Sequence, residues 1–204
     1  MRAVIISGGA IADYDYIKQQ ITADDTIICA DSGYHHAERM QLNVDLLVGD
    51  FDSIRCVPDG VATISYPSEK DSTDTELALG SARQKGFCNF LFIAGTGSRM
   101  DHTLANIFLL QDCLQKGESA QLLNEYNKIM ITDSILSLQE ETGALISLIP
   151  ISDCHGVTTK NLRYPLYEAD LSIGSTRGVS NVMLEQHAVV SVRRGTLLVI
   201  VAKD

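Results

Sequence analysis

Short apolar runs alternate with segments of helical periodicity between Ala3 and Leu114. Buried strands are predicted where apolar and β-branched residues are bounded by glycine, proline or polar residues, at 3–7, 26–30, 46–48, 61–66 and 90–94. Helices are predicted at 14–20, 35–40, 71–85 and 101–114, and residues 53–61 as a loop or short helix. This alternation indicates an α/β fold with a mainly parallel, open sheet.

The pattern changes at Asn127, after which helical periodicity is nearly absent. Short strands are predicted at 128–132, 134–138, 144–149, 155–159, 183–185, 188–192 and 196–202, with turn residues such as Glu141-Thr142-Gly143 between them. This pattern favours an all-β, sandwich-like domain. We therefore expect an α/β domain at residues 1–126 and a β-sandwich domain at residues 127–204.

Polar clusters occupy the places where the predicted strands of the first domain end. They are Asp31-Ser32-Gly33, residues 49–53, residues 70–74 and residues 95–102. Because ligands of open α/β sheets bind outside the carboxyl ends of the strands, we expect these four clusters to converge on one site.

Four carboxylates dominate two of these clusters. Asp50 and Asp52 are two residues apart after a strand, so their side chains point to the same side. Asp71 and Asp74 are three apart where a helix should begin, and they share a face of its first turn. The alternative is structural, with turn-forming aspartates and Asp71 as a helix cap. Close carboxylates repel one another, and they favour Mg²⁺, a hard cation that binds a few carboxylates and substrate phosphates.

The loop at residues 95–99 precedes a predicted helix, where free N–H groups attract anions. Arg99 adds a planar donor that matches phosphate oxygens. Asp101 and His102 follow. They are either catalytic groups or, in the structural alternative, a helix cap (Asp101) and a surface residue (His102). A second glycine turn, Gly8-Gly9-Ala10, also admits a phosphate. Residue types and spacing alone therefore indicate a Mg²⁺-dependent enzyme that acts on a nucleotide or another phosphate ester.

Composition and charge argue against some classes of binding partner. The 204 residues carry a net charge of −10 and show no basic patch, which argues against nucleic-acid binding. Five scattered cysteines without a CxxC pair indicate buried free thiols rather than disulfides or zinc. With no signal-peptide pattern and no apolar run of membrane-spanning length, we expect a cytoplasmic protein that is not bound to a membrane.

Several motifs, taken in order, resemble the bacterial thiamine pyrophosphokinases over nearly the whole chain. They are ADSG at 30–33, GDFDS at 49–53, KDSTDTELAL at 70–79, GTGSRMDHTLAN at 95–106, NLRYPLYEADL at 161–171 and RGVSN at 177–181. The resemblance implies transfer of the pyrophosphoryl group of ATP to the hydroxyl of thiamine, which yields thiamine diphosphate and AMP. It also implies a homodimer with thiamine bound between the α/β domain of one subunit and the β-domain of the other.

The resemblance also assigns residues by motif. Catalysis would fall to Asp50, Asp52, Asp71, Asp74 and Asp101, and the first four of these would hold Mg²⁺. ATP would contact Asp31, Ser32, Gly33, Lys70, Gly95, Thr96, Gly97, Arg99 and His102, and thiamine would lie near Arg177, Ser180 and Asn181. One departure is Ser98, where the family usually has a second glycine. A positive φ at Ser98 would strain the loop and weaken ATP binding.

Two other functions fit parts of the same sequence. A DxD-type nucleotidyl- or glycosyltransferase would also use Asp50 and Asp52 with a divalent ion, but it leaves the clusters at 70–74 and 95–102 unexplained. An inactive nucleotide or thiamine sensor would bind ligand without turnover, and it would need no catalytic metal site.

Overall fold

Two compact units, Met1–Glu125 and Tyr126–Asp204, make up the computed structural model, which describes residues 1–52, 54 and 60–203. Ser53 of the GDFDS motif, Cys56 and most of the expected loop or short helix at 53–61 lie outside the described residues.

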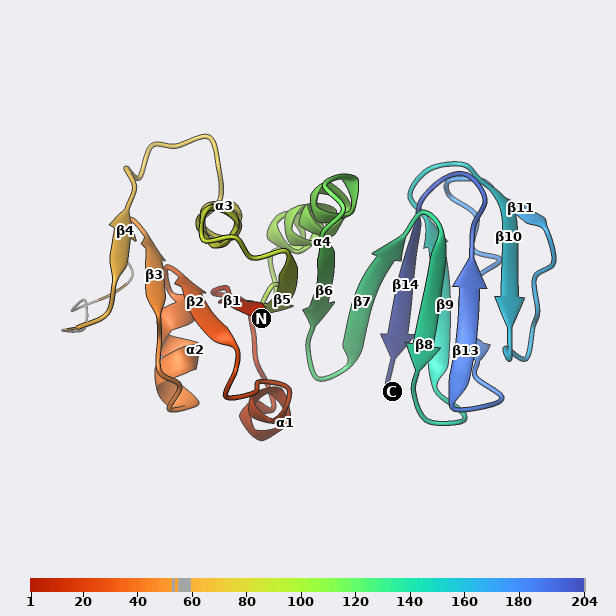
Figure 1. Ribbon diagram of the computed structural model, residues 1–204, viewed down its shortest axis with the longest axis horizontal. Helices are drawn as coiled ribbons and strands as arrows, with labels where there is room; N and C mark the ends of the chain where they lie inside the picture. The colour runs from red at the N-terminus through yellow and green to blue at the C-terminus, as the bar shows by residue number, and fades with distance from the viewer. Residues whose placement is uncertain (53, 55–59, 204) are drawn as a thin grey trace. The chain divides into compact units, whose positions relative to one another are not determined.

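The sheet of the first unit has the strand order β6-β5-β1-β2-β3-β4, and every one of these pairings is parallel (Figure 1). The strands are β1 (Ala3–Ile6), β2 (Thr26–Ala30), β3 (Leu46–Gly49), β4 (Thr63–Ser65), β5 (Asn89–Ile93) and β6 (Ser119–Leu123). The predicted open parallel sheet is confirmed, whereas β6 has no counterpart among the predicted strands.

Helices cover both faces of this sheet, with α1 and α2 on one side and α3 and α4 on the other (Figure 1). Val4 and Ile6 of β1 pack in one buried cluster with Ile17 of α1 and Ala37 of α2. Burial on both faces explains why the strands are continuous apolar runs. The helices are α1 (Tyr14–Gln19), α2 (Gly33–Arg39), α3 (Asp74–Gln84) and α4 (Met100–Gln115).

Helix α3 begins later than the sequence predicts. Its N-cap is Thr73, whose Oγ1 accepts a hydrogen bond from the N–H of Glu76 at 3.2 Å. Asp74 is the first helical residue, so Asp71 is not the cap. In α4 the N-cap position is Arg99, and Asp101 lies in the first turn, so Asp101 is not a cap either. Both carboxylates are therefore left for other roles.

The second unit contains two antiparallel sheets, in the orders β12-β9-β14-β7 and β11-β10-β13-β8. Leu148 of β9 and Val199 of β14 share one buried cluster with Leu138 of β8 and Val190 of β13, so the two sheets pack face to face as a sandwich. The strands are β7 (Asn127–Thr132), β8 (Ile135–Gln139), β9 (Leu145–Pro150), β10 (Cys154–Lys160), β11 (Ala169–Leu171), β12 (Asn181–Val182), β13 (His187–Ser191) and β14 (Leu197–Ala202).

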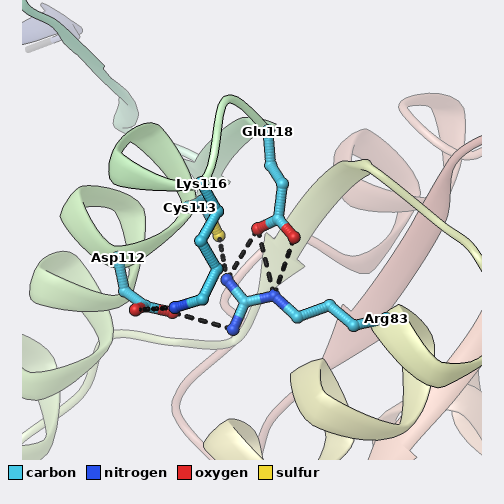
Figure 2. A network of polar contacts seen from close by, with 5 residues as sticks. All are labelled: Arg83, Asp112, Cys113, Lys116 and Glu118. Carbon is cyan, nitrogen blue, oxygen red and sulfur yellow. Dashed lines mark hydrogen bonds and ion pairs between the residues drawn. The ribbon is translucent and has the colours of Figure 1, made fainter.

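A polar network ties the ends of α3, α4 and β6 together (Figure 2). Arg83 of α3 lies 2.6 Å from Glu118 and 2.7 Å from Asp112, and Lys116 also pairs with Asp112. Burial opposes the charge on Arg83, but its carboxylate partners outweigh that effect and raise its pKa. Burial also raises the pKa of the neighbouring Cys113 thiol to about 12, so this thiol stays protonated.

Among the described cysteines, Cys29, Cys113 and Cys154 are free and buried, as expected. Cys88 is free but exposed, so the expectation of burial is wrong for this thiol. Within the described part of the chain, no helix combines the length and apolar character needed to cross a membrane.

Candidate active site

A cavity of about 660 Å³ lies among the loops at the carboxyl ends of the first unit's strands. Its volume is in the range of pockets that hold a small-molecule ligand. Of the residues predicted to bind ATP or act in catalysis, the following line it: Asp31, Ser32, Lys70, Asp74, Gly95, Thr96, Gly97, Arg99 and His102. Gly33, Asp50, Asp52, Asp71 and Asp101 do not belong to this lining.

Three carboxylates meet beside the strand ends. Asp31, Asp50 and Asp52 each place an oxygen within 4.8 Å of the others, and Asp52 is exposed while the other two are partly buried. A hydrogen bond from the Ser68 side chain and one from the Asp52 N–H lower the pKa of Asp50, so this carboxylate is ionised at neutral pH. Three close carboxylates form a donor set that fits a hard divalent cation. The grouping holds two predicted metal ligands and Asp31, whereas Asp71 and Asp74 lie outside it.

Lys70 brings positive charge to this cavity. Its Nζ lies 2.6 Å from Asp74 Oδ1, and both side chains are largely covered. Partial burial opposes the charge on Lys70, but Asp74, Asp50 and Asp31 more than offset it and raise the Lys70 pKa. Lys70 is therefore a fixed ammonium group, suited to a phosphate oxygen.

The glycine turn after β1 lines the same cavity and is tightly constrained. The N–H of Gly9 donates to Ala94 O at 2.8 Å, and the N–H of Ala10 donates to Thr96 O at 2.9 Å. A β-carbon on Gly8 would lie 2.0 Å from Ser32 Oγ, and one on Gly9 would lie 2.3 Å from the Ala94 carbonyl oxygen. The contact at Gly9 is with backbone, so only glycine fits there, whereas the contact at Gly8 is with the end of a side chain.

Hydrogen bonds to helix α4 hold the glycine loop at residues 95–99. Asn106 Nδ2 donates to Gly95 O at 2.8 Å, and the N–H of Gly97 donates to Thr103 Oγ1 at 3.2 Å. Ser98 is not among the residues with positive φ, so it adds no left-handed strain where the family usually has glycine. The loop therefore keeps a defined shape despite the departure from the family pattern.

Arg99 and Asp101 form an exposed ion pair with 2.6 Å between Arg99 Nη2 and Asp101 Oδ2. Hydrogen bonds from Arg99 and then from the His102 backbone lower the pKa of Asp101 to about 2. Asp101 is thus a weak base in this conformation. Arg99 is engaged by a carboxylate, and a ligand anion would compete with it.

Non-glycine residues with positive φ mark the carboxyl ends of three strands. Asp31 follows β2 with φ 43°, Phe51 lies just beyond β3 with φ 63°, and Ala94 follows β5 with φ 54°. Such conformations cost free energy and persist where the surrounding structure holds them, often at functional sites.

The three predicted thiamine-binding residues lie in the second unit, at and just before β12. Asn181 is buried, and its side chain binds the backbone of Tyr164, accepting from the N–H at 2.9 Å and donating to the carbonyl at 2.7 Å. Ser180 has a left-handed backbone with φ 60°, and its N–H donates to Ser147 Oγ at 3.1 Å. Arg177 is exposed. Asn181 therefore shapes the loop that carries Tyr164.

Several hydroxyl side chains and one amide side chain of the cavity are absent from the predicted set. They are Ser7, Ser68, Ser72, Thr73, Thr75, Thr103 and Asn106. Ser7 Oγ and Thr75 Oγ1 lie 2.9 Å apart in a buried contact that joins β1 to α3. Most of these residues fall inside or beside the recognised motifs. The whole motif, rather than its charged members alone, could therefore have indicated that they line the cavity.

A parallel sheet that gathers glycine loops, a lysine and carboxylates at its carboxyl edge defines an α/β enzyme for a phosphate-bearing ligand. Two family models match the chain, "Thiamin pyrophosphokinase, catalytic domain" over residues 17–122 and "Thiamin pyrophosphokinase, vitamin B1 binding domain" over residues 133–197. The chain belongs to the thiamin pyrophosphokinase family and is an enzyme of that type.

Individual relatives agree. The thiamine pyrophosphokinase of Bacillus subtilis strain 168 is 33% identical over 165 residues, which cover 76% of this chain and 77% of that protein. The crystal structure of thiamine pyrophosphokinase from Bacillus subtilis is similar, with a TM-score of 0.91, 25% identity and complete coverage of both chains. That of a thiamin pyrophosphokinase family protein from Enterococcus faecalis has a TM-score of 0.86, 27% identity and the same coverage.

Proposed function

We propose that this enzyme transfers the pyrophosphoryl group of ATP to the hydroxyl of thiamine, giving thiamine diphosphate and AMP in thiamine diphosphate biosynthesis. The observation that carries the proposal is a cavity lined by Lys70 and by both glycine loops, with the Asp31–Asp50–Asp52 group beside the same strand ends. Family membership supplies the identity of the two substrates.

The cluster of Asp31, Asp50 and Asp52 supports Mg²⁺ as the metal. Asp50 and Asp52 would hold the ion with Asp31, and Asp71 and Asp74 remain proposed ligands from the second acidic motif. When bound, the ion would neutralise phosphate charge, which is a main requirement of phosphoryl transfer. Asp31, assigned to ATP by the sequence motif, would then serve the metal as well as the nucleotide.

The protein's own groups would position the triphosphate. Lys70 supplies an ammonium group, and the loops after β1 and β5 supply N–H and hydroxyl donors around the cavity. Ser32, Gly33, Thr96 and His102 remain proposed contacts of ATP. Arg99 would bind a phosphate oxygen after exchanging its partner Asp101 for the ligand.

The proposed reaction forms one bond and breaks one. The thiamine hydroxyl oxygen forms a bond to the β-phosphorus of ATP. At the same time the β-phosphorus loses its bond to the oxygen that bridges the α- and β-phosphates. AMP leaves with this bridging oxygen. The hydroxyl proton passes late to a carboxylate, because phosphoryl transfer needs little help from a base. Release from Arg99 would raise the low pKa of Asp101 and make it a better acceptor.

Thiamine is proposed to bind near Arg177, Ser180 and Asn181, in a homodimer whose sites lie at the subunit interface. A net charge of −10 suits a substrate with a fixed positive charge. We also place the enzyme in the cytoplasm, where its donor ATP is available.

The test is a product assay with the purified enzyme, ATP, Mg²⁺ and thiamine. We expect AMP and thiamine diphosphate in equal amounts, and no AMP when thiamine or Mg²⁺ is omitted. ADP with thiamine monophosphate would overturn pyrophosphoryl transfer. Free pyrophosphate would favour a nucleotidyltransferase, and binding without turnover would favour a sensor.

A further inference from the structure

His36 contacts the glycine turn after β1 but does not line the cavity. It belongs to α2 and is partly buried. Its Nε2 lies 2.7 Å from the carbonyl oxygen of Gly9, and its Nδ1 lies 2.7 Å from the hydroxyl oxygen of Tyr14 in α1. A carbonyl oxygen can only accept, so Nε2 carries the proton and donates it, while Nδ1 accepts from the Tyr14 hydroxyl. The two contacts specify one neutral tautomer.

The surroundings of His36 favour this neutral form. Burial lowers the pKa of His36, the hydrogen bond to Gly9 opposes that effect, and the neighbouring His35 and then the positive charge of Arg39 lower the pKa further. The Arg39 guanidinium carbon lies 4.1 Å from the centre of the Tyr14 ring, and this ring lies 5.7 Å from the His36 imidazole. Arg39, Tyr14 and His36 therefore form a packed chain of contacts that leads to Gly9.

His36 fixes the orientation of one peptide group in the turn. The C=O and N–H of a trans peptide point in opposite directions. Gly9 O points to His36, and the next N–H, that of Ala10, donates to Thr96 O on the other side. Gly8 lines the cavity, and within the described residues its N–H has no hydrogen-bond acceptor.

We propose that His36 is a positioning residue for nucleotide binding, because it holds the Gly9 carbonyl away from the anionic ligand while Gly8 presents its N–H. Without the His36 donor, only the bond from the Ala10 N–H to Thr96 O would hold the Gly9–Ala10 peptide, and a carbonyl oxygen turned into the cavity would repel a phosphate. The inference rests on the proposed function, in which the ligand is the triphosphate of ATP.

The test compares three variants of the full-length protein by calorimetric titration with Mg²⁺–ATP in the absence of thiamine. His36→Leu removes the donor to Gly9, His36→Gln keeps an N–H donor, and His35→Leu is the matched control at the neighbouring exposed histidine. We expect His36→Leu to weaken ATP binding about tenfold, the effect of one lost hydrogen bond. His36→Gln should stay within about threefold of the parent protein, and His35→Leu should match the parent.

Steady-state kinetics separate positioning from general damage. His36→Leu should raise the KM for ATP and leave the KM for thiamine unchanged, with the protein still folded by circular dichroism. Equal affinity for ATP in the parent and in folded His36→Leu would overturn the inference. So would equal losses in His36→Leu and His36→Gln, or a rise in both KM values.

Nitrogen NMR of ¹⁵N-histidine-labelled protein tests the geometry without any ligand. We expect the His36 side chain at pH 7 to show a protonated Nε2 and an unprotonated Nδ1, and protonation at Nδ1 alone would overturn the assignment. Because this readout and ATP binding need no turnover, both can succeed when the product assay fails. An inactive protein that still binds ATP through His36 would refute only the proposed reaction.

Discussion

Lys70 Nζ lies 2.6 Å from Asp74 Oδ1, and this pair joins the segment before α3 to the first residue of that helix. Asp74→Asn should therefore loosen the lysine as well as remove a proposed metal ligand. A hydrogen bond between charged groups contributes about 1.5–3 kcal/mol, so we expect kcat/KM for ATP to fall roughly 10- to 100-fold. Initial rates at saturating thiamine measure this change.

Glu76→Gln is the control for that prediction, because Glu76 is exposed and also lies in the first turn of α3. It removes the same charge from the same turn without touching Lys70, and it should leave kcat/KM within about twofold. Similar losses in both variants would mean that the charge of the turn matters, rather than the pair.

The Asp31–Asp50–Asp52 group predicts that activity depends on Mg²⁺ in a specific way. Asp52→Asn removes one charge from the Asp31–Asp50–Asp52 group and should raise the Mg²⁺ concentration for half-maximal activity by about tenfold or more, a loss seen even for outer-shell partners. A chelator should abolish turnover by the parent enzyme, and added Mg²⁺ should restore it. Asp15→Asn, at an exposed aspartate of α1, should not change the Mg²⁺ requirement. An unchanged Mg²⁺ requirement in Asp52→Asn would refute a metal site at this group.

Arg83 should stabilise the fold without acting in catalysis. Arg83→Met leaves Glu118 and Asp112 without their shared partner, and the Glu118 side chain is only 12% exposed. Breaking such a covered pair costs about 3 kcal/mol, which urea denaturation would measure, while the KM for ATP should not change. The matched control is Arg193→Met, because the Arg193–Glu168 pair is exposed and should contribute less than about 1 kcal/mol. Equal losses in the two variants would contradict the role given to Arg83.

Asp25 gives a prediction for the pH dependence of stability. Burial raises its pKa, but hydrogen bonds from Arg2 and from the Thr22 N–H outweigh this effect, so the pKa lies below the ordinary 3.8. Because the folded-state pKa is the lower one, the stabilisation is complete above about pH 5 and declines as the pH falls through 3.8 and lower. Asp25→Asn should lower the free energy of unfolding by about 2 kcal/mol at pH 7, and the difference should shrink toward pH 3.

Urea denaturation at several pH values measures the difference for Asp25→Asn. The control is Asp24→Asn, at the exposed neighbour of Asp25, and it should have little effect at any pH. A difference between Asp25→Asn and the parent that stays constant down to pH 3 would show that the charge of Asp25 does not act as described.

The parallel sheet and its polar strand ends could be predicted from sequence because each strand is a short apolar run followed by glycine or aspartate. Strand β6 could not, since Ser119–Leu123 has only two consecutive leucines and is held by pairing with β5. The start of α3 was predicted too early, at Asp71, because Asp71, Ser72 and Thr73 are all residue types that favour the N-cap position. Only the backbone path selects Thr73.

Sequence reasoning recovered the charged members of the cavity and missed contacts between distant positions. Asn181 was predicted to lie near thiamine, but its hydrogen bonds to Tyr164, 17 residues away, have no local signal. The contact of His36 with Gly9 joins positions 27 residues apart, and it depends on how α2 packs beside β1. Long-range packing of this kind is set by the tertiary fold rather than by periodicity or motif spacing.

The left-handed backbone at Asp31, Phe51 and Ala94 has a consequence for any laboratory search for heat-resistant variants. Glycine relieves the steric cost of positive φ, so such a search should be drawn to glycine at all three positions. At Asp31 the change would delete a carboxylate of the proposed metal site, and at Phe51 it would remove a side chain packed on the core. At Ala94 it would remove only a methyl group, so heat resistance should rise there without loss of activity. At Asp31 the same gain should cost activity, and at Phe51 the lost packing should offset it.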